Sequence, residues 1–414
     1  MESLIRNRQY YKFCFYGFLK NLRFFDAFFI LFLMEKGLPF TQIGILYAVR
    51  EIVINISEIP SGIIADTFGR KRALVGSFFL YIASFLVFYI SSGFWVFLLA
   101  FVFYGIADAF RSGTHKGMIM EYLKLHGWEE QKINYYGHTR AWSQMGSAIS
   151  SLLAGVIVFY SGTYQYIFLY SVIPYMLNMI LIASYPGELN GSAGRGDPNR
   201  PGMRSTVVTF LKMIRQPKVL EIVNTSAFHT AYLKAVKDYI QPLMVHVALL
   251  VPIMLHSDTE KRNGIIIGLI YFLIYLLTAR ASQLSSKIAM RNKRSITFIT
   301  LIFGLIFGVV SGVLYIHGYW IIALLAFVGI FIVENIRKPV LTGFIADEVP
   351  NDILTSVISA QAFISTLMTA IIALILGIVA DHFGLGVSLL TVSLLLALLT
   401  IMIKVNSQLH NKRR

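Results

Sequence analysis

Cationic side chains interrupt two long apolar stretches of the sequence at matching places. Lys20 and Arg23 lie three residues apart in the first half of the chain, and Lys234 and Lys237 repeat that spacing in the second half. Residues three apart share a face of a helix. Ionisable groups in an apolar medium are costly and face a cavity or a partner. These four positions are therefore candidates for binding an anion.

Two interpretations of these clusters stay open. In the first, Asp26 and Asp238 pair with the neighbouring cations and brace the helices. In the second, the cations line a cavity and bind the negative group of a solute. One acid for two cations on each helix leaves charge unbalanced, which favours the second. Four further residues complete the candidate binding set: Tyr47, Arg50, Arg111 and Tyr271.

Carboxylates in the same apolar stretches are candidate proton carriers. Glu51, Asn55 and Glu58 follow one another at helical spacing and predict a polar stripe that faces inward. Glu58 lies next to a charged loop and is interpreted as structural. Carboxylates enclosed in an apolar cavity are typical of groups that exchange protons. Asp26 and Glu51 are the two candidates for this role.

The fourth apolar stretch places Tyr104, Asp108, Arg111 and His115 on one helix face. Asp108 and Arg111 are three residues apart, so an ion pair between them is the alternative to a binding role for Arg111.

The composition is that of an integral membrane protein. Apolar residues make up 56% of the 414 residues and charged residues only 14%, whereas soluble domains are about a quarter charged. At about 20 residues for each crossing, this length accommodates roughly 12 helices. The net charge of +15 comes mainly from short loops, which argues against nucleic acid as a partner. With Cys14 as its one cysteine and no nucleotide or zinc motif, the chain predicts no metal, no cofactor and no enzyme activity.

Hydropathy and turn residues predict an all-α protein with twelve transmembrane helices. The predicted spans of the first half are Phe13–Met34, Thr41–Ala65, Ala73–Ser91, Phe94–Lys116, Gly137–Tyr160 and Tyr164–Tyr185. Those of the second half are Val219–Pro252, with an interruption at Pro242, then Gly264–Ile288, Ile296–Ile316, Tyr319–Leu341, Leu354–Ala380 and Val387–Val405. Residues 1–185 and 219–414 are predicted to form two six-helix bundles, joined by a polar linker over 186–218.

The cations also predict an orientation. Basic residues gather at both ends of the chain, in 70–72, in 195–218 and in 291–294, while the alternate loops are nearly neutral. Cytoplasmic loops carry the excess of lysine and arginine. We therefore expect a multi-pass protein of the inner or plasma membrane, with both termini and the linker in the cytoplasm.

The two halves repeat one another at charged and glycine positions. Besides the lysine pairs, Gly44-x-x-Tyr47 of the second span returns as Gly268-x-x-Tyr271 in the eighth. The spacing of Asp108, Arg111, Gly117, Ile119 and Glu121 returns in Glu334, Arg337, Gly343, Ile345 and Asp347. Gly155 and Gly162 correspond to Gly377 and Gly384. Four matches in the same order indicate a duplication, and hence two bundles related by a pseudo-two-fold axis.

The loop after the second span carries a recognisable motif. Six residues match Gly-x-x-x-Asp-x-x-Gly-Arg-Lys-Arg: Gly62, Asp66, Gly69, Arg70, Lys71 and Arg72. The chain thereby resembles the major facilitator superfamily, although Thr67 stands where that family often has a cation. The resemblance implies the superfamily's fold, transport by alternating access and a gating role for this loop. It also implies that Glu121 pairs with a cation of the loop and locks the outward-facing state, with Arg140 as a competing partner.

These observations favour a secondary active transporter, expected to act as a monomer and to move a small organic anion, with proton coupling as a further hypothesis. The alternative is a multidrug or toxic-compound exporter, which an aromatic cavity would suit: Phe24, Phe25, Tyr47, Tyr104 and Tyr271. The fifth span, however, lacks the Gly-x-x-x-Gly-Pro-x-x-Gly-Gly pattern that many drug–proton antiporters of the superfamily carry. After Arg111 the superfamily's Arg-x-x-Gln-Gly motif is missing too.

Overall fold

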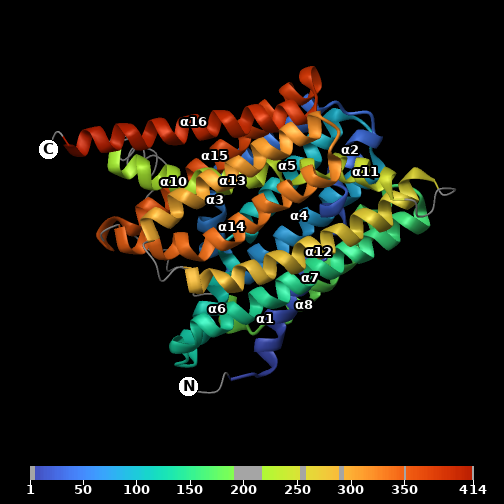
Figure 1. Ribbon diagram of the computed structural model, residues 1–414. Coiled ribbons are helices and arrows are strands. Elements are labelled where there is room, and N and C mark those ends of the chain that lie inside the picture. Colours follow the sequence, from blue (N-terminus) through green and yellow to red (C-terminus); the bar gives the residue numbers. More distant parts are fainter. Residues whose placement is uncertain (1–4, 191–216, 252–257, 289–292, 349–350, 413–414) are drawn as a thin grey trace. The chain divides into compact units, whose positions relative to one another are not determined.

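The computed structural model describes residues 5–190, 217–251, 258–288, 293–348 and 351–412. Every regular element in these ranges is helical, as expected (Figure 1). The first half contains α1 (Arg8–Lys20), η1 (Phe24–Ala27), α2 (Phe29–Glu35), α3 (Phe40–Phe68), α4 (Arg70–Ile90), α5 (Phe94–Arg111), α6 (Thr114–Leu125), η2 (Glu129–Gln131), α7 (Lys132–Ser161), α8 (Tyr166–Ala183) and η3 (Gly187–Asn190). The second half contains α10 (Pro217–Val236), η4 (Lys237–Tyr239), α11 (Ile240–Leu250), α12 (Thr259–Ile288), α13 (Lys293–Ile316), α14 (Trp320–Glu348), α15 (Asn351–Phe383) and α16 (Leu385–Lys412).

Within the described ranges, nine helical stretches are long and apolar enough to cross a membrane. They cover nine of the twelve predicted spans. The predicted first, second and seventh spans correspond to α1–α2, α3 and α10–α11. Most of the predicted linker, from residue 191 to 216, lies outside the described residues.

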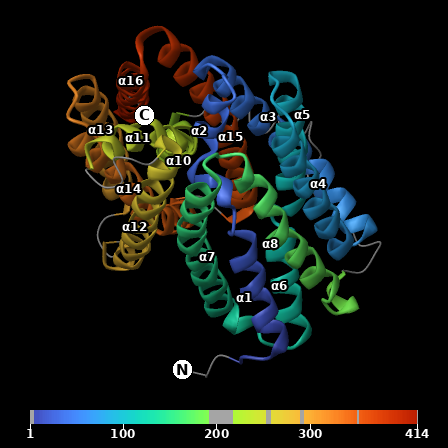
Figure 2. The same cartoon turned by 90° about the vertical axis from the view of Figure 1, so that its right-hand side faces the viewer.

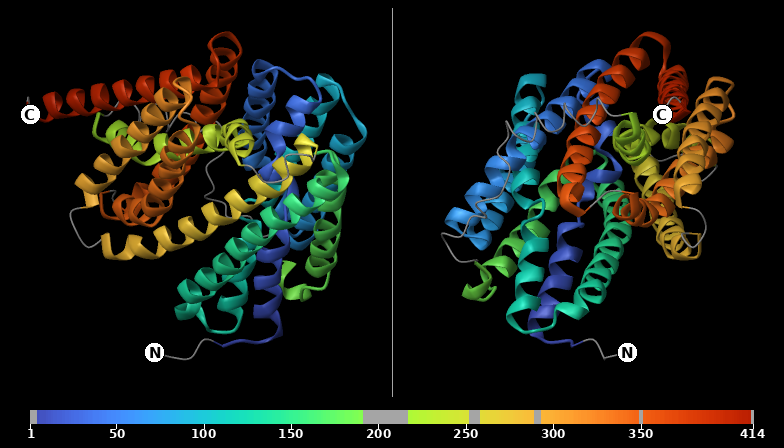
Figure 3. Two further views of the ribbon diagram at one scale, coloured as in Figure 1. Left: turned by 45° about the vertical axis from the view of Figure 1, so that its right-hand side comes forward. Right: turned by 90° about the vertical axis from the view of Figure 1, so that its left-hand side faces the viewer.

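The chain divides into two compact units. Unit 1 holds residues 1–36, 53–200 and 253–275, and unit 2 holds 37–52, 201–252 and 276–414. In unit 1, α1 packs against α7 and α8, and α4 against α5 and α8 (Figure 2). In unit 2, α13 packs against α14 and α16, and α10 against α15 (Figure 3). The helices α3 and α12 are divided between the units, with one end of each helix in unit 1 and the other in unit 2. The two six-helix bundles stay a prediction.

The first predicted span is not one continuous helix, contrary to expectation. The helix α1 ends at Lys20, and the side-chain amide of the capping residue Asn21 donates a 2.7 Å hydrogen bond back to the carbonyl of Gly17. A short 3₁₀ turn, η1, separates it from α2. Asparagine competes for backbone groups and favours helix ends. The break places Lys20, Arg23 and Asp26 at helix ends rather than along one face.

The seventh predicted span is broken as well, but not at Pro242. The interruption is η4, Lys237–Tyr239, and α11 has already begun when Pro242 is reached. Proline is tolerated in a first helical turn, where its missing N–H would have had no partner. The fourth predicted span is also divided, between Arg111 and Thr114, where Gly113 adopts a φ of +77°.

Aromatic packing holds η1 in place in unit 1. The ring of Phe25 stacks on Phe168 of α8 with centroids 5.4 Å apart. It also lies against Phe85 of α4 and Tyr104 of α5. Lipid is as apolar as the side chains themselves, so the hydrophobic effect does not drive helices together within the membrane. Van der Waals and ring contacts hold them together instead. Phe25 therefore anchors the turn that carries Asp26.

Candidate functional site

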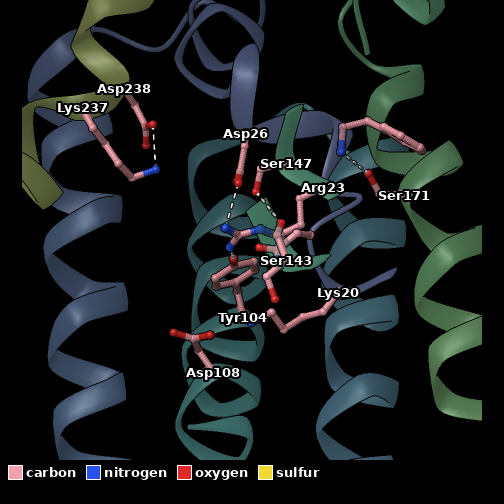
Figure 4. A network of polar contacts seen from close by, with 12 residues as sticks. Lys20, Arg23, Asp26, Tyr104, Asp108, Ser143, Ser147, Ser171, Lys237 and Asp238 are labelled. Atoms are coloured by element: carbon pink, nitrogen blue, oxygen red, sulfur yellow. Dashed lines mark hydrogen bonds and ion pairs between the residues drawn. The ribbon is translucent and has the colours of Figure 1, made fainter. Parts of the chain in front are cut away.

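Arg23 lies at the centre of the cationic cluster of unit 1. Its Nη2 is 2.8 Å from Oδ2 of Asp26, and its Nη1 donates a 3.0 Å hydrogen bond to the hydroxyl of Tyr104 on α5 (Figure 4). The two charged side chains are 29% and 22% exposed. The pairing that the sequence left open therefore exists, and Arg23 is already neutralised.

A second ion pair lies one helix away, between Arg111 and Asp108 of α5. Tyr81 of α4 joins it, because its hydroxyl donates a 2.5 Å hydrogen bond to Oδ1 of Asp108 and accepts a 2.9 Å bond from Nε of Arg111. The ion-pair interpretation of Asp108 and Arg111 is thus the one the structure shows. Sequence reasoning missed Tyr81, whose only signal was a polar ring in an apolar helix.

Lys20 completes the cluster of unit 1. It is the last residue of α1, where the negative end of the helix dipole favours a cation. Figure 4 shows its side chain extending towards Tyr104 and Asp108. Among the described residues no hydrogen bond or ion pair to its ammonium group is found, although its backbone carbonyl accepts a 3.1 Å bond from Tyr175.

The cationic cluster of unit 2 is built at the break between α10 and α11. Nζ of Lys237 donates to Oδ1 of Asp238 at 2.9 Å, and the hydroxyl of Tyr47 on α3 donates to Oδ2 at 2.9 Å. The guanidinium of Arg50 lies 4.7 Å from the centre of the Tyr47 ring and forms a 2.9 Å ion pair with Glu51. Two cations of this cluster are therefore matched by two acids.

Lys234 belongs to the same cluster but differs from its neighbours. It lies in the last turn of α10, and its side chain is exposed. Within the described part of the chain its ammonium group has no hydrogen bond or ion pair. By the spacing of the repeat, Lys234 corresponds to Lys20 and Lys237 to Arg23. Among the described residues, each cationic cluster therefore holds two ion pairs and one lysine at the end of a broken helix.

The last candidate binding residue, Tyr271, lies on α12 in unit 1 and is 4% exposed, with its ring 6.3 Å from that of Tyr275. The candidate proton carriers Asp26 and Glu51 both face an arginine, Arg23 and Arg50 respectively. Their role in proton transfer stays a prediction.

Comparison with known proteins decides the family. A model described as "Major Facilitator Superfamily" matches residues 14–373. The chain belongs to the major facilitator superfamily. Over 374 residues it is 23% identical to the "Uncharacterized MFS-type transporter YxaM" of Bacillus subtilis (strain 168), which covers 90% of this chain and 89% of that protein.

Solved structures share the superfamily fold. The nucleoside transporter NupG, as its D323A mutant, superposes with a TM-score of 0.74 at 12% identity, covering 96% of this chain and 98% of that one. A POT family transporter in complex with 5-aminolevulinic acid gives 0.71 at 13% identity, covering 97% and 96%. A D-xylose–proton symporter gives 0.66 at 14%, covering 95% of each chain. The chain is thus a multi-pass membrane protein of a transporter family.

The superfamily loop is ordered around Gly69, whose φ of +101° suits glycine alone. The side chain of Asn190 in η3 accepts a 3.1 Å bond from the backbone N–H of Lys71, and Nζ of Lys71 donates to the carbonyl of Tyr185 at 2.8 Å. The loop is therefore tied to the segment that follows α8.

Other members of the predicted gate are placed less fully. Arg70 lies beside Gly117 of α6, one turn before Glu121. No ion pair between Glu121 and the loop occurs among the described contacts. Gly62 is half-buried and Arg72 exposed, while the side chain of Asp66 lies outside the described residues. Their gating role stays a prediction.

Proposed function

We propose that this superfamily transporter moves a small organic anion and that Lys20 and Lys234 bind its negative group. The observation that carries the proposal is the charge balance of the two clusters. Arg23, Arg111, Arg50 and Lys237 each have an acidic partner in the described structure. Lys20 and Lys234 have none there, and they occupy equivalent positions in the two repeats.

The unmatched ammonium group of half-buried Lys20 is costly, and an anion that binds it offsets the cost. Lys234 is exposed, so its ammonium group is open to a solute. A carboxylate or phosphate accepts short, charge-assisted hydrogen bonds from lysine. Both lysines also lie at the C-terminal end of a half-helix, next to backbone that leaves the helix. Such discontinuous helices are where transporters of this kind hold solutes and ions.

The duplicated arrangement supports alternating access as the mechanism. Each repeat supplies one lysine, so either unit can hold the negative group of a solute. The D-xylose–proton symporter among the structural relatives shows that the fold serves proton coupling in that protein, and we propose coupling to protons here too. From the loop charges we further propose that both termini lie in the cytoplasm.

The exporter alternative receives no support from the rings that suggested it. Phe24, Phe25, Tyr47, Tyr104 and Tyr271 are between 1% and 7% exposed. Phe25 and Tyr104 pack against one another and against the core of unit 1. Low exposure of these rings is what packing inside the protein gives, so they do not by themselves favour the exporter alternative.

Transport into proteoliposomes tests the proposal. The full chain is reconstituted, and uptake is compared for organic carboxylates and phosphates, for neutral nucleosides and sugars, and for a hydrophobic cation such as tetraphenylphosphonium. We expect transport of an anion, and we expect Lys20→Ala and Lys234→Ala each to weaken it. Lysine-to-arginine replacements at both positions should retain more activity because the charge is kept.

Lys36→Ala is the matched control. Lys36 lies in the turn after α2 and donates a 2.8 Å hydrogen bond to Gln165, away from the cluster, so transport should be unchanged. Full anion transport by a folded Lys20→Ala, Lys234→Ala double variant would contradict the assignment of the lysines. Transport of the hydrophobic cation alone would contradict the substrate class.

A further inference from the structure

A polar cluster that the cationic site does not use is enclosed within unit 2. His229 and Thr230 of α10 both bind Glu334 of α14: Nδ1 of His229 is 2.8 Å from Oε2, and the hydroxyl of Thr230 donates to Oε1 at 2.7 Å. The side chains of His229 and Glu334 are 0% and 1% exposed. Sequence reasoning did not single out His229, because a lone histidine in an apolar helix gives no pattern.

The cluster differs from its counterpart in the other repeat. Glu334 and Arg337 have the spacing of Asp108 and Arg111, which form a direct ion pair. In unit 2 the guanidinium of Arg337 donates instead to the carbonyls of Thr225 and Thr297 and, at 2.7 Å, to the hydroxyl of Thr300. The acid is held by a histidine, which is a cation only when it carries an additional proton.

The hydrogen bonds define the protonation state that suits this packing. A carboxylate is an acceptor, so Nδ1 of His229 carries the hydrogen and donates it to Glu334. Nε2 has no partner and lies so close to Gly304 of α13 that a methyl group there would overlap it. Glu334, Arg337 and a neutral His229 sum to zero charge, whereas one more proton would give the enclosed cluster a net positive charge, which is unfavourable in a buried site.

We propose that the His229–Glu334 pair is the proton-binding site that couples transport to the proton gradient, an inference that rests on the proposed function. The proton binds at Nε2 when α10 and α13 separate enough to admit water. The Nδ1–H bond to Glu334 is kept, and it becomes an imidazolium–carboxylate ion pair. A bound anion would offset the added positive charge, which links proton binding to solute binding.

Other charged groups near the pair leave this assignment intact. Among the described residues, the charged groups that act on His229 are Glu334 and Arg337, both of α14. In the described contacts, α15 and α16 meet α10 through uncharged groups, Gln361 with Ser226 and Ser393 with Tyr232. Lys404 of α16 instead lies over the ring of Phe298 on α13, with Nζ 3.2 Å from its centre.

The earlier candidates are less suited to the role. Asp26 and Glu51 are paired with Arg23 and Arg50. Arginine cannot release its proton in a protein, so protonating either acid breaks an ion pair and leaves the charge of the guanidinium unbalanced. Protonating His229 creates an ion pair instead. The pair on α10 and α14 is therefore the one that can gain a proton and keep its contact.

Proton binding can be measured without knowing the solute. The purified full chain, labelled with ¹⁵N-histidine, is titrated from alkaline to acidic pH in lipid nanodiscs, and the imidazole signal of His229 is assigned as the one missing in His229→Gln. We expect that signal to titrate, and we expect Glu334→Gln to lower its proton affinity by about tenfold or more, since one pKa unit corresponds to about 1.4 kcal/mol. Glu35→Gln, which removes a carboxylate bound to Thr163 on the other unit, should leave it unchanged.

A transport measurement completes the test. In proteoliposomes, His229→Gln and Glu334→Gln should lose anion accumulation driven by a pH gradient while exchange of the anion at equal pH continues. Glu35→Gln, which lies outside both clusters, should keep the pH-driven component. Folding of each variant is checked by its melting temperature relative to the wild type.

The outcomes separate the two proposals. If the wild type transports no anion but the His229 signal titrates and responds to Glu334→Gln, the proposed substrate class is wrong and the proton site stands. If the signal stays that of a neutral imidazole throughout, the proton site is wrong. The proton site is equally wrong if Glu334→Gln retains pH-driven accumulation, and this variant settles the question should His229→Gln not fold.

Discussion

Gly44 of α3 and Gly377 of α15 bring two helix backbones into direct contact. A Cβ added at Gly44 would lie 3.3 Å from the Cα of Gly377 and 2.5 Å from the carbonyl oxygen of Ala373. The repeat-related crossing occurs in unit 1, where a Cβ at Gly155 of α7 would lie 3.3 Å from the Cα of Gly268 on α12. Small residues allow such close approach in membranes.

Leucine at Gly44 or at Gly155 should therefore force the helices apart. Overpacking a close contact costs about 1–3 kcal/mol, and here the obstacle is backbone, which cannot rotate away. We expect a lower melting temperature, read for Gly155→Leu from the reaction of buried Cys14 with a fluorogenic maleimide, and reduced exchange activity. The control is Gly76→Leu on α4, where an added Cβ meets nothing within 4 Å. Equal melting of Gly76→Leu and Gly155→Leu would refute the close-contact argument.

The glycine crossings show which part of the molecule was predictable. The sequence pairs Gly44 with Gly268 and Gly155 with Gly377 by spacing alone, and the structure uses these four residues at two equivalent crossings. Repeated spacing survives because each repeat needs the same backbone approach. The all-α fold and the superfamily followed in the same way, from hydropathy and from a loop of defined residues.

The helix breaks could not be predicted from the same signals. No proline or glycine marks the end of α1, which is set by the bond from Asn21 to the carbonyl of Gly17 and by Phe25 packing against α8. In the seventh span the visible breaker, Pro242, is not at the break. The partners of the charged side chains could not be predicted either. Only tertiary packing brings the hydroxyl of Tyr47 on α3 within hydrogen-bond distance of Asp238.

Asp381 should stabilise the start of α3. Its Oδ1 accepts the backbone N–H of Phe40 at 2.7 Å, and its Oδ2 accepts that of Thr41 at 2.6 Å. A carboxylate at a helix N-terminus satisfies free N–H groups and the helix dipole. Asp381→Ala should lower the free energy of unfolding by roughly 0.5–2 kcal/mol, and Asp381→Asn by less, because one oxygen remains.

Thermal melting of the purified variants measures this effect. Asp258→Ala serves as the control, because Asp258 forms an exposed ion pair with Lys261 at 2.7 Å, and such pairs contribute little. An Asp381→Ala variant that melts no earlier than Asp258→Ala would show that the cap is not stabilising.

Removing the hydroxyl of Tyr47 should weaken the cluster of unit 2. Asp238 is 4% exposed and receives bonds from both Tyr47 and Lys237. In Tyr47→Phe the buried carboxylate loses one donor, which costs about 1–3 kcal/mol. We expect a lower melting temperature and weaker solute binding, since Lys237 and Asp238 lie next to Lys234. Tyr160→Phe, at a ring that is 80% exposed, should match the wild type in both measurements. If Tyr47→Phe also matches the wild type, Tyr47 does not contribute to the site.

Replacing Arg337 with lysine should destabilise the protein more than the equivalent change at Arg111. Arg337 is 1% exposed, and its guanidinium reaches acceptors on both α10 and α13. A lysine ammonium is a single point and cannot span them, so buried carbonyl groups would lose their donors at about 1–3 kcal/mol each. Arg111 has a side chain that is 22% exposed and binds Asp108 and Tyr81, contacts that a lysine can keep in part. Melting of Arg337→Lys and Arg111→Lys, compared in the same detergent, checks the order, and a larger loss at Arg111 would show that the enclosed cluster of unit 2 is not the more tightly held of the two.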